Sequence, residues 1–155
     1  MITRRQFLIL TCAATAAPAR AQLPTNIVAQ RKAALAAALR EVTGSAPVRS
    51  GRVKLDLPPL VDNGNTVPLS VTVESPMTDT DHVRAIHVFT EKNPQPKIIS
   101  VTLGPRAGRA YVATRARIAD SGDVVAIAQM SDGSFWQENV KVIVTLSACL
   151  EEGLI

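Results

Sequence analysis

Hydrophobic and polar residues alternate with a period of two along much of the chain after residue 52. The alternation is cleanest over residues 67–73, where valine and leucine alternate with proline, serine and threonine, as in a strand with one buried face. Residues 124–130 are mostly apolar at both odd and even positions, so both faces of this strand are expected to be buried, as in a central strand. The expected strands, about seven in number, cover residues 52–57, 67–73, 82–91, 97–103, 109–118, 124–130 and 138–147. Turn signals separate them at short intervals, so the pattern predicts an antiparallel β-sandwich.

The segment before these strands has a helical pattern from about residue 25 to residue 42. Thr25 or Asn26 can cap its start, and Gly44 can end it. The apolar stripe of this helix consists of Ile27, Val28, Leu35, Leu39 and Val42. A single helix with such a stripe is expected to pack on the sheet that follows it or on a partner.

The expected strand over residues 82–91 carries apolar residues on both faces. Phe89 and Val83 lie on one parity, and Ile86 and Val88 lie on the other. Either another element of this chain or a partner protein must therefore cover the second face. We expect His87 to pack at an interface or in the core.

The last expected strand places a cysteine just beyond its end. Val140, Val142, Val144 and Leu146 are expected to face the core. Cys149 has the opposite parity and is expected to face outward, six residues before the end of the sequence. Glu151 and Glu152 put negative charge beside the sulfur, which disfavours the thiolate.

The start of the chain has the features of an export signal. Arg4 and Arg5 form a twin arginine ahead of an apolar run, and residues 19–21 supply a small-x-small cleavage pattern. The run is too short to span a bilayer. We expect cleavage after Ala21, export by the twin-arginine pathway and a periplasmic location. Cys12 would be discarded with the signal, which leaves Cys149 as the lone thiol.

Charge and composition exclude several classes of function. The formal net charge is +4, but Arg4, Arg5 and Arg20 belong to the expected signal, so the mature chain is close to neutral. A nearly neutral chain has no excess of positive charge to attract nucleic acid, and an aromatic content of 3% is too low for stacking on bases. Nucleic-acid binding is therefore not expected. His82 and His87 have opposite parity, so a shared metal is not expected. We expect neither a metal nor a resident cofactor, and we find no catalytic constellation.

Several other polar or aromatic positions have both a functional and a structural interpretation. Asp79, Asp81 and His82 cluster in one turn, where capping is the default role and an acid–base or metal role the alternative. The strand-end aspartates, for which capping is also expected, are Asp120, Asp123 and Asp132. The outward basic row, expected to be solvated rather than to bind an anion, consists of Arg109, Arg115 and Arg117. Trp136 is expected to anchor the core, with an interface as the alternative.

Four stretches of the chain resemble the family of the sulfur-oxidation carrier protein SoxY. They are VDNGNTVP at 61–68, SPMTD at 75–79, IHVFTEKNP at 86–94 and MSDGSFW at 130–136. The resemblance runs over most of the mature chain and implies an immunoglobulin-like sandwich. It divides the sequence into a signal peptide (1–21), an N-terminal helical region (22–46), a SoxY-like sandwich (47–148) and a tail (149–155).

The resemblance also implies a function and partners. Members pair with SoxZ in the periplasm, and a cysteine near the C-terminus carries sulfur intermediates covalently during thiosulfate oxidation. A haem enzyme, a hydrolase and a sulfur dehydrogenase act on that cargo in turn, and the carrier itself catalyses nothing. By position, the resemblance assigns the covalent sulfur carrier role to Cys149 and suggests the strand around His87 as a surface for SoxZ.

The residues around Cys149 depart from the family pattern. The family tail is typically Gly-Gly-Cys-Gly-Gly, whereas this chain has Ser-Ala-Cys-Leu-Glu-Glu-Gly-Leu-Ile over residues 147–155. The leading hypothesis is therefore a carrier subunit loaded on Cys149. The alternative is a non-catalytic binding or scaffold subunit of a SoxYZ-like complex that has lost the glycine arm. A third possibility is a homodimer linked through Cys149.

Overall fold

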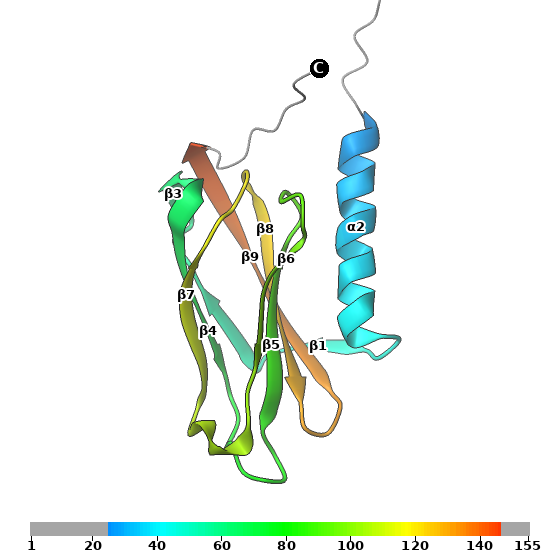
Figure 1. Cartoon of the computed structure of the whole chain (residues 1–155), viewed down its shortest axis with the longest axis vertical. Coiled ribbons are helices and arrows are strands. Elements are labelled where there is room, and N and C mark those ends of the chain that lie inside the picture. The colour runs from blue at the N-terminus through cyan, green and yellow to red at the C-terminus, as the bar shows by residue number, and fades with distance from the viewer. Residues whose placement is uncertain (1–24, 147–155) are drawn as a thin grey trace, which may run out of the picture.

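A computed structural model describes the chain from residue 25 to residue 146 (Figure 1). It contains one long helix, two short 3-10 helices and nine strands within these residues. In chain order the elements are α2 (Thr25–Thr43), β1 (Val48–Ser50), β2 (Val53–Asp56), β3 (Leu60–Asn63), η1 (Gly64–Thr66), β4 (Val67–Val73), β5 (Val83–Thr90), β6 (Lys97–Thr102), η2 (Pro105–Ala107), β7 (Ala110–Ala116), β8 (Gly122–Met130) and β9 (Phe135–Leu146).

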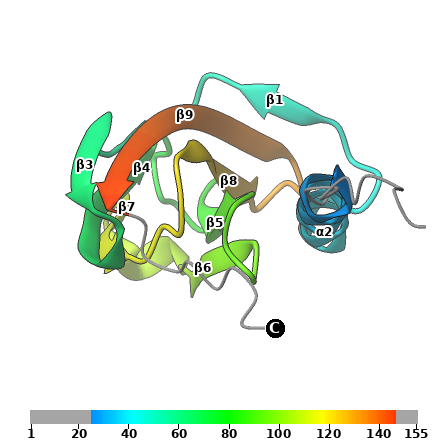
Figure 2. The ribbon, with the colours of Figure 1, turned by 90° about the horizontal axis from the view of Figure 1, so that it is seen from above.

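The strands form two sheets, and the predicted sandwich is confirmed. The larger sheet has the order β1-β9-β8-β5-β6, with β3 also paired to β9. The smaller sheet has the order β2-β4-β7. Most pairs are antiparallel, as predicted, but β1 and β3 both run parallel to β9. Figure 2 shows β9 crossing the molecule from the side of α2 to the side of β3.

The main core lies between the two sheets and follows the predicted alternation. Along β4 the apolar residues Val67, Leu69, Val71 and Val73 are buried, while Pro68 and Thr72 between them are exposed. In β8, residues 124–128 are all buried, as expected for a central strand, because β5 and β9 flank it and both of its faces are covered.

The second face of β5 is covered by the chain's own helix. Phe89 is fully buried and belongs to a separate apolar cluster on the outer face of the larger sheet. The helix-covered cluster consists of Phe89, Val125, Ile127 and Phe135. Leu35, Leu39 and Val42 of the predicted helix stripe pack on it together with Ala38, whereas Ile27 and Val28 of that stripe are exposed. Of the two coverings that the sequence allowed at this position, the intramolecular one is observed.

Helix α2 begins at Thr25 and ends at Thr43, as the sequence predicted. Gly44 follows with a φ of 60°, a left-handed conformation that glycine adopts without steric cost. Its amide donates to the carbonyl of Arg40, which satisfies an orphan acceptor of the last turn. Nothing in the described range, from residue 25 to residue 146, is a helix both long and apolar enough to cross a membrane.

The sequence-based prediction was wrong at four points. Two of the observed strands, residues 48–50 and Leu60–Asn63, were not among the expected ones. Residues 135 and 136 belong to one 12-residue strand with the rest of β9. Leu146, expected in the core, is 67% exposed because it lies beyond the last buried layer at Val144.

Candidate functional site

The C-terminal end of β9 is the point from which the cysteine-bearing segment departs. Cys149 itself lies outside the described residues, so the structure places the strand end rather than the sulfur. β3 flanks this end on one side, with Leu60 beside Ile143 and Val61 beside Val144. The amide of Ile143 also donates to the carbonyl of Pro59 at 2.9 Å. The last described residues are therefore fixed to the sandwich by backbone hydrogen bonds.

A serine side chain fixes the other side of the same strand end. The pairing of β8 with β9 stops at Gly122 and Val142. Beyond it, the Ser121 hydroxyl accepts from the amide of Val144 at 2.9 Å and lies 3.3 Å from the Val144 carbonyl, to which it can donate. The serine side chain thus takes the place of a backbone strand partner for Val144. Sequence analysis missed Ser121, because a serine before a strand carries no signal for such a role.

Thr145 adds a side-chain bond to β3. Its hydroxyl donates to the carbonyl of Asp62 at 3.1 Å, with the Val61 carbonyl at 3.4 Å. The strand is thus held to within one residue of its end at Leu146. Only three peptide units separate Leu146 from Cys149, so the two Cα atoms lie within about 11 Å of each other in any conformation.

Two large apolar side chains lie exposed beside this strand end. Leu60 is 58% exposed and Ile143 is 52% exposed, and the two are register partners of parallel strands, so their side chains share a face. We call Leu60 and Ile143 the β3–β9 patch. Lys141 lies two residues before Ile143 on the same face of β9 and is also exposed.

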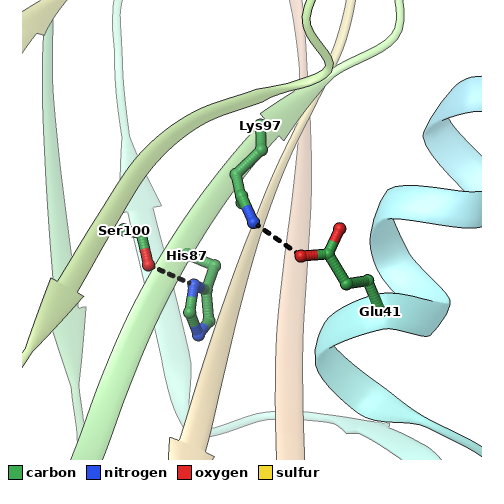
Figure 3. Close-up of polar contacts among 4 residues, drawn as sticks. All are labelled: Glu41, His87, Lys97 and Ser100. Carbon is green, nitrogen blue, oxygen red and sulfur yellow. Dashed lines mark hydrogen bonds and ion pairs between the residues drawn. The ribbon is translucent and has the colours of Figure 1, made fainter.

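His87 lies on the outer face of β5, near the helix (Figure 3). Its Nδ1 lies 2.8 Å from the Ser100 hydroxyl, and its ring is 6.3 Å from that of Phe89. Burial and the nearby positive charge of Lys97 lower the pKa of His87 from its ordinary value. Lys97 in turn donates to a carboxylate oxygen of Glu41 on α2 at 3.2 Å. His87 therefore packs at the border of the helix-covered cluster, where burial and Lys97 disfavour the protonated ring.

The structure does not bring His82 and His87 together. His82 Nδ1 lies 3.1 Å from the Thr78 carbonyl, and the Thr78 hydroxyl accepts from the amide of Asp81. The turn at residues 75–82 is therefore capped, as expected, but through Ser75 and Thr78 instead of the neighbouring aspartates. Within residues 25–146 the structure contains no group of three or more His, Cys, Asp or Glu residues that could hold a metal ion.

Two of the strand-end aspartates do act as turn caps. Asp120 accepts from the amide of Ser121, and Asp132 accepts from both the amide and the hydroxyl of Ser134. These hydrogen bonds lower the pKa of Asp132. Trp136 is half-buried against the main core, with the guanidinium groups of Arg49 and Arg52 over its ring at 5.8 Å and 5.1 Å.

An open groove of about 680 Å³ crosses the outer face of the smaller sheet. Its walls include Pro58, Pro59 and Pro68, with Asp56 and Arg115 among its charged residues. Arg115 belongs to the predicted basic row, which the structure confirms as exposed. Arg109 of that row lies over the ring of Tyr111 at 4.6 Å.

Glu138 is a second residue that sequence analysis missed. Its carboxylate accepts from the amide of Leu55 and so joins β9 of the larger sheet to β2 of the smaller one. The alternation of residues along β9 showed only that position 138 is polar. A carboxylate between two sheets needs a hydrogen-bond donor, and the sequence does not show that the amide of Leu55 supplies it. Glu138 therefore adds a polar link between the two sheets, which otherwise contact each other through the main core.

Comparison with known proteins gives a family match over most of the chain. The model of the family described as "Sulfur oxidation protein SoxY" matches residues 39–149, a range that ends on Cys149. A search of curated proteins found no match.

Solved structures match more than half of the chain. The sulfur carrier protein SoxY from Chlorobium limicola f. thiosulfatophilum superposes with a TM-score of 0.62 and 26% identity, covering 74% of this chain and 99% of that one. A superoxide reductase (neelaredoxin) from Ignicoccus hospitalis gives 0.54 and 19%, covering 61% and 80%. A putative superoxide reductase from Thermotoga maritima gives 0.52 and 20%, covering 64% and 93%. At these identities the likeness to the reductases concerns the fold alone.

Proposed function

The chain belongs to the SoxY family of sulfur oxidation proteins, and we propose that it is a periplasmic carrier subunit that binds sulfur intermediates covalently on Cys149. The observation that carries this proposal is that the family match extends as far as Cys149 and ends there. The likeness to a sulfur carrier protein over 99% of that protein's length supports the same role.

The end of β9 supports the proposal geometrically. Bonds from Pro59, Ser121 and Thr145 hold the strand almost to its last residue. Three peptide units join Leu146 to Cys149, so the Cα atom of the cysteine stays within about 11 Å of this strand end in any conformation. A carrier needs such an anchor, because its cargo must stay attached while successive enzymes act on it.

The loading step follows from thiol chemistry. The thiolate of Cys149 and the outer sulfur of thiosulfate form an S–S bond, and two electrons leave to a haem acceptor on a separate enzyme. The product is a cysteine S-thiosulfonate. Water then attacks the sulfonate sulfur under the action of a hydrolase, which releases sulfate and two protons and leaves a persulfide on Cys149. The persulfide sulfur is the substrate of a dehydrogenase, and the carrier contributes only the attachment point.

We further propose a SoxZ or SoxZ-like partner and export by the twin-arginine pathway. Family membership supports the partner, and the Arg4–Arg5 pair ahead of an apolar run supports the export route. The surface around His87 is a poorer candidate for the SoxZ interface than the sequence suggested, because α2 covers the adjoining cluster.

A scaffold subunit without cargo is the second candidate. The observation that favours it is the sequence of the tail, where Leu150 and Glu151 stand in place of the two glycines expected after the cysteine and Glu152 follows them. Bulky and acidic side chains beside the sulfur hinder entry into a narrow channel and disfavour the thiolate. In this case the chain would still pair with a SoxZ-like protein, but Cys149 would stay unmodified.

The test compares Cys149→Ser with Cys12→Ser in the host grown on thiosulfate. The carrier proposal expects Cys149→Ser to abolish thiosulfate oxidation, and Cys12→Ser to leave it unchanged because residue 12 lies in the expected signal. Intact mass of the purified wild-type chain should show thiosulfonate or persulfide adducts that Cys149→Ser lacks. Undiminished oxidation together with an unmodified Cys149 would reject the carrier role and leave the scaffold.

A further inference from the structure

The outer face of the smaller sheet has short side chains along its centre and longer, charged or aromatic ones along its borders. On the central strand β4, the outward residues are Pro68, Ser70 and Thr72. Ala113 of β7 is the register partner of Ser70, so no long side chain rises from this part of the face. The groove of about 680 Å³ lies over this floor. A low floor between raised borders can accept a second protein surface.

The two borders of this face carry opposite charges beside the groove. Asp56 of β2 and Arg115 of β7 both line it, and both are exposed. β4 lies between β2 and β7, so the border strands are about 10 Å apart. Within residues 25–146, the one ion pair within 4.0 Å joins Lys97 to Glu41, so neither border charge has such a partner in the described chain. Each can therefore pair with a charge on another molecule.

A two-fold axis along β4 makes the two borders complementary to each other. When two copies face each other across such an axis, β7 of one copy lies over β2 of the other, and each residue keeps its height along the strands. Asp56 is the register partner of Ser70. Arg115 is the register partner of Pro68, two residues or about 7 Å away along β4. The long arginine side chain spans that step, so the axis generates two equivalent ion pairs.

The next row of the same face is complementary as well. Lys54 of β2 and Tyr111 of β7 are both register partners of Thr72, so the axis places Lys54 of one copy over Tyr111 of the other. Tyr111 is 39% exposed, and Arg109 of its own chain lies over its ring at 4.6 Å. Exposed tyrosine and arginine side chains are typical anchors of protein interfaces. Glu74 follows on β4 and would meet its own counterpart on the axis, beside the positive charge of Arg109.

We propose that the outer face of β2, β4 and β7 is the interface of a homodimer, in which Asp56 of each copy pairs with Arg115 of the other across a two-fold axis along β4. The occupant is a second copy of this chain because the face is complementary to itself. The end of β9 belongs to the larger sheet and lies outside this interface. The inference therefore goes beyond the carrier proposal and does not depend on the chemistry of Cys149.

The experiment measures the dissociation constant of the dimer by sedimentation equilibrium of the full chain. Cys12→Ser and Cys149→Ser form the parent background, so that no disulfide can link two copies. Asp56→Arg and Arg115→Asp are each expected to raise Kd by about tenfold, because each places like charges opposite each other at two symmetric positions. The double variant exchanges the two charges and should return Kd to within about threefold of the parent.

Controls separate loss of the interface from loss of the fold. Arg84→Asp changes the charge of an exposed arginine on β5 of the larger sheet and should leave Kd unchanged. Urea unfolding checks that each variant is folded, which is expected because the substituted side chains are exposed. Tyr111→Ala tests the same interface without a change of charge and should raise Kd several-fold.

Three results would overturn the proposal. The parent chain could stay monomeric at concentrations up to about 100 μM. The single charge reversals could leave Kd unchanged, or both could weaken the dimer with no recovery in the double variant, which would contradict the two-fold pairing.

Another occupant of the face would give a different pattern. Release of a co-purifying protein by the same single reversals, with a parent chain that is monomeric, would assign the face to that protein and contradict the homodimer. None of these results bears on sulfur loading, which the comparison of Cys149→Ser with Cys12→Ser in the host tests separately.

Discussion

The outer face of the larger sheet has two apolar regions that differ in solvent exposure. At one end, Phe89 and Ile127 are 0% and 1% exposed because α2 packs over them. At the other end, Leu60 and Ile143 are 58% and 52% exposed. Figure 2 shows α2 and β3 at opposite sides of the molecule, joined by the length of β9. The same sheet face is thus structural at one end and available for contact at the other.

The difference shows how covering elements are distributed along this chain. The helix precedes the sandwich in sequence and covers the region near β1, where the chain enters the larger sheet. The tail follows the sandwich and departs near β3. The helix therefore covers one end of the outer face, and β9 ends at the other.

The largest effect should come from the helix-covered cluster. Phe89→Ala removes a fully buried ring and is expected to lower the free energy of unfolding by about 3–5 kcal/mol. Ile143→Ala at the exposed end should cost less than about 1 kcal/mol. Urea unfolding of both variants checks the contrast, and similar losses at the two sites would contradict the distinction between the two regions.

A smaller effect should appear as pH dependence at the border of the helix-covered cluster. The pKa of His87 is lowered in the folded chain, so the unfolded chain binds a proton more readily. Stability should therefore be unaffected by His87 above its ordinary pKa and should fall as pH drops below about 6.5. His87→Gln should reduce this loss between pH 7 and pH 5 in urea unfolding experiments. An unchanged pH slope would show that the ring titrates normally.

The smallest effect should come from the ion pair between Glu41 on α2 and Lys97 on β6. Glu41→Gln removes the partner of Lys97, but both side chains are exposed to solvent, at 70% and 36%. The expected loss of stability is at most about 0.5 kcal/mol and should shrink further at high salt. A loss of several kcal/mol would mean that the helix is held by charge instead of by its apolar stripe.

Most of the fold could be predicted from alternation, and the failures have specific causes. Strands such as β4 bury one face against a single core, so their period of two is clean. β1 and β3 are three and four residues long, too short for a period to emerge, and they pair in parallel with a strand far along the chain. No local pattern encodes a partner at that distance.

The site was predictable only in part. The parity of β9 correctly marked Val142 and Val144 as buried, and the motif stretches identified the family. The contacts that fix the strand end come from Ser121 and Thr145, whose roles depend on tertiary position. The exposure of Leu60 likewise depends on which elements happen to pass over it, and hydrophobicity along the chain does not report that.

The unbroken course of β9 has a mechanical consequence. A protein that grips the residues beyond Leu146 pulls along the axis of a 12-residue strand whose hydrogen bonds to β8 run across that axis. Such a force loads many of the hydrogen bonds between β8 and β9 at the same time, so they do not break one after another. Force applied at the C-terminal end of β9 is therefore resisted by several hydrogen bonds together.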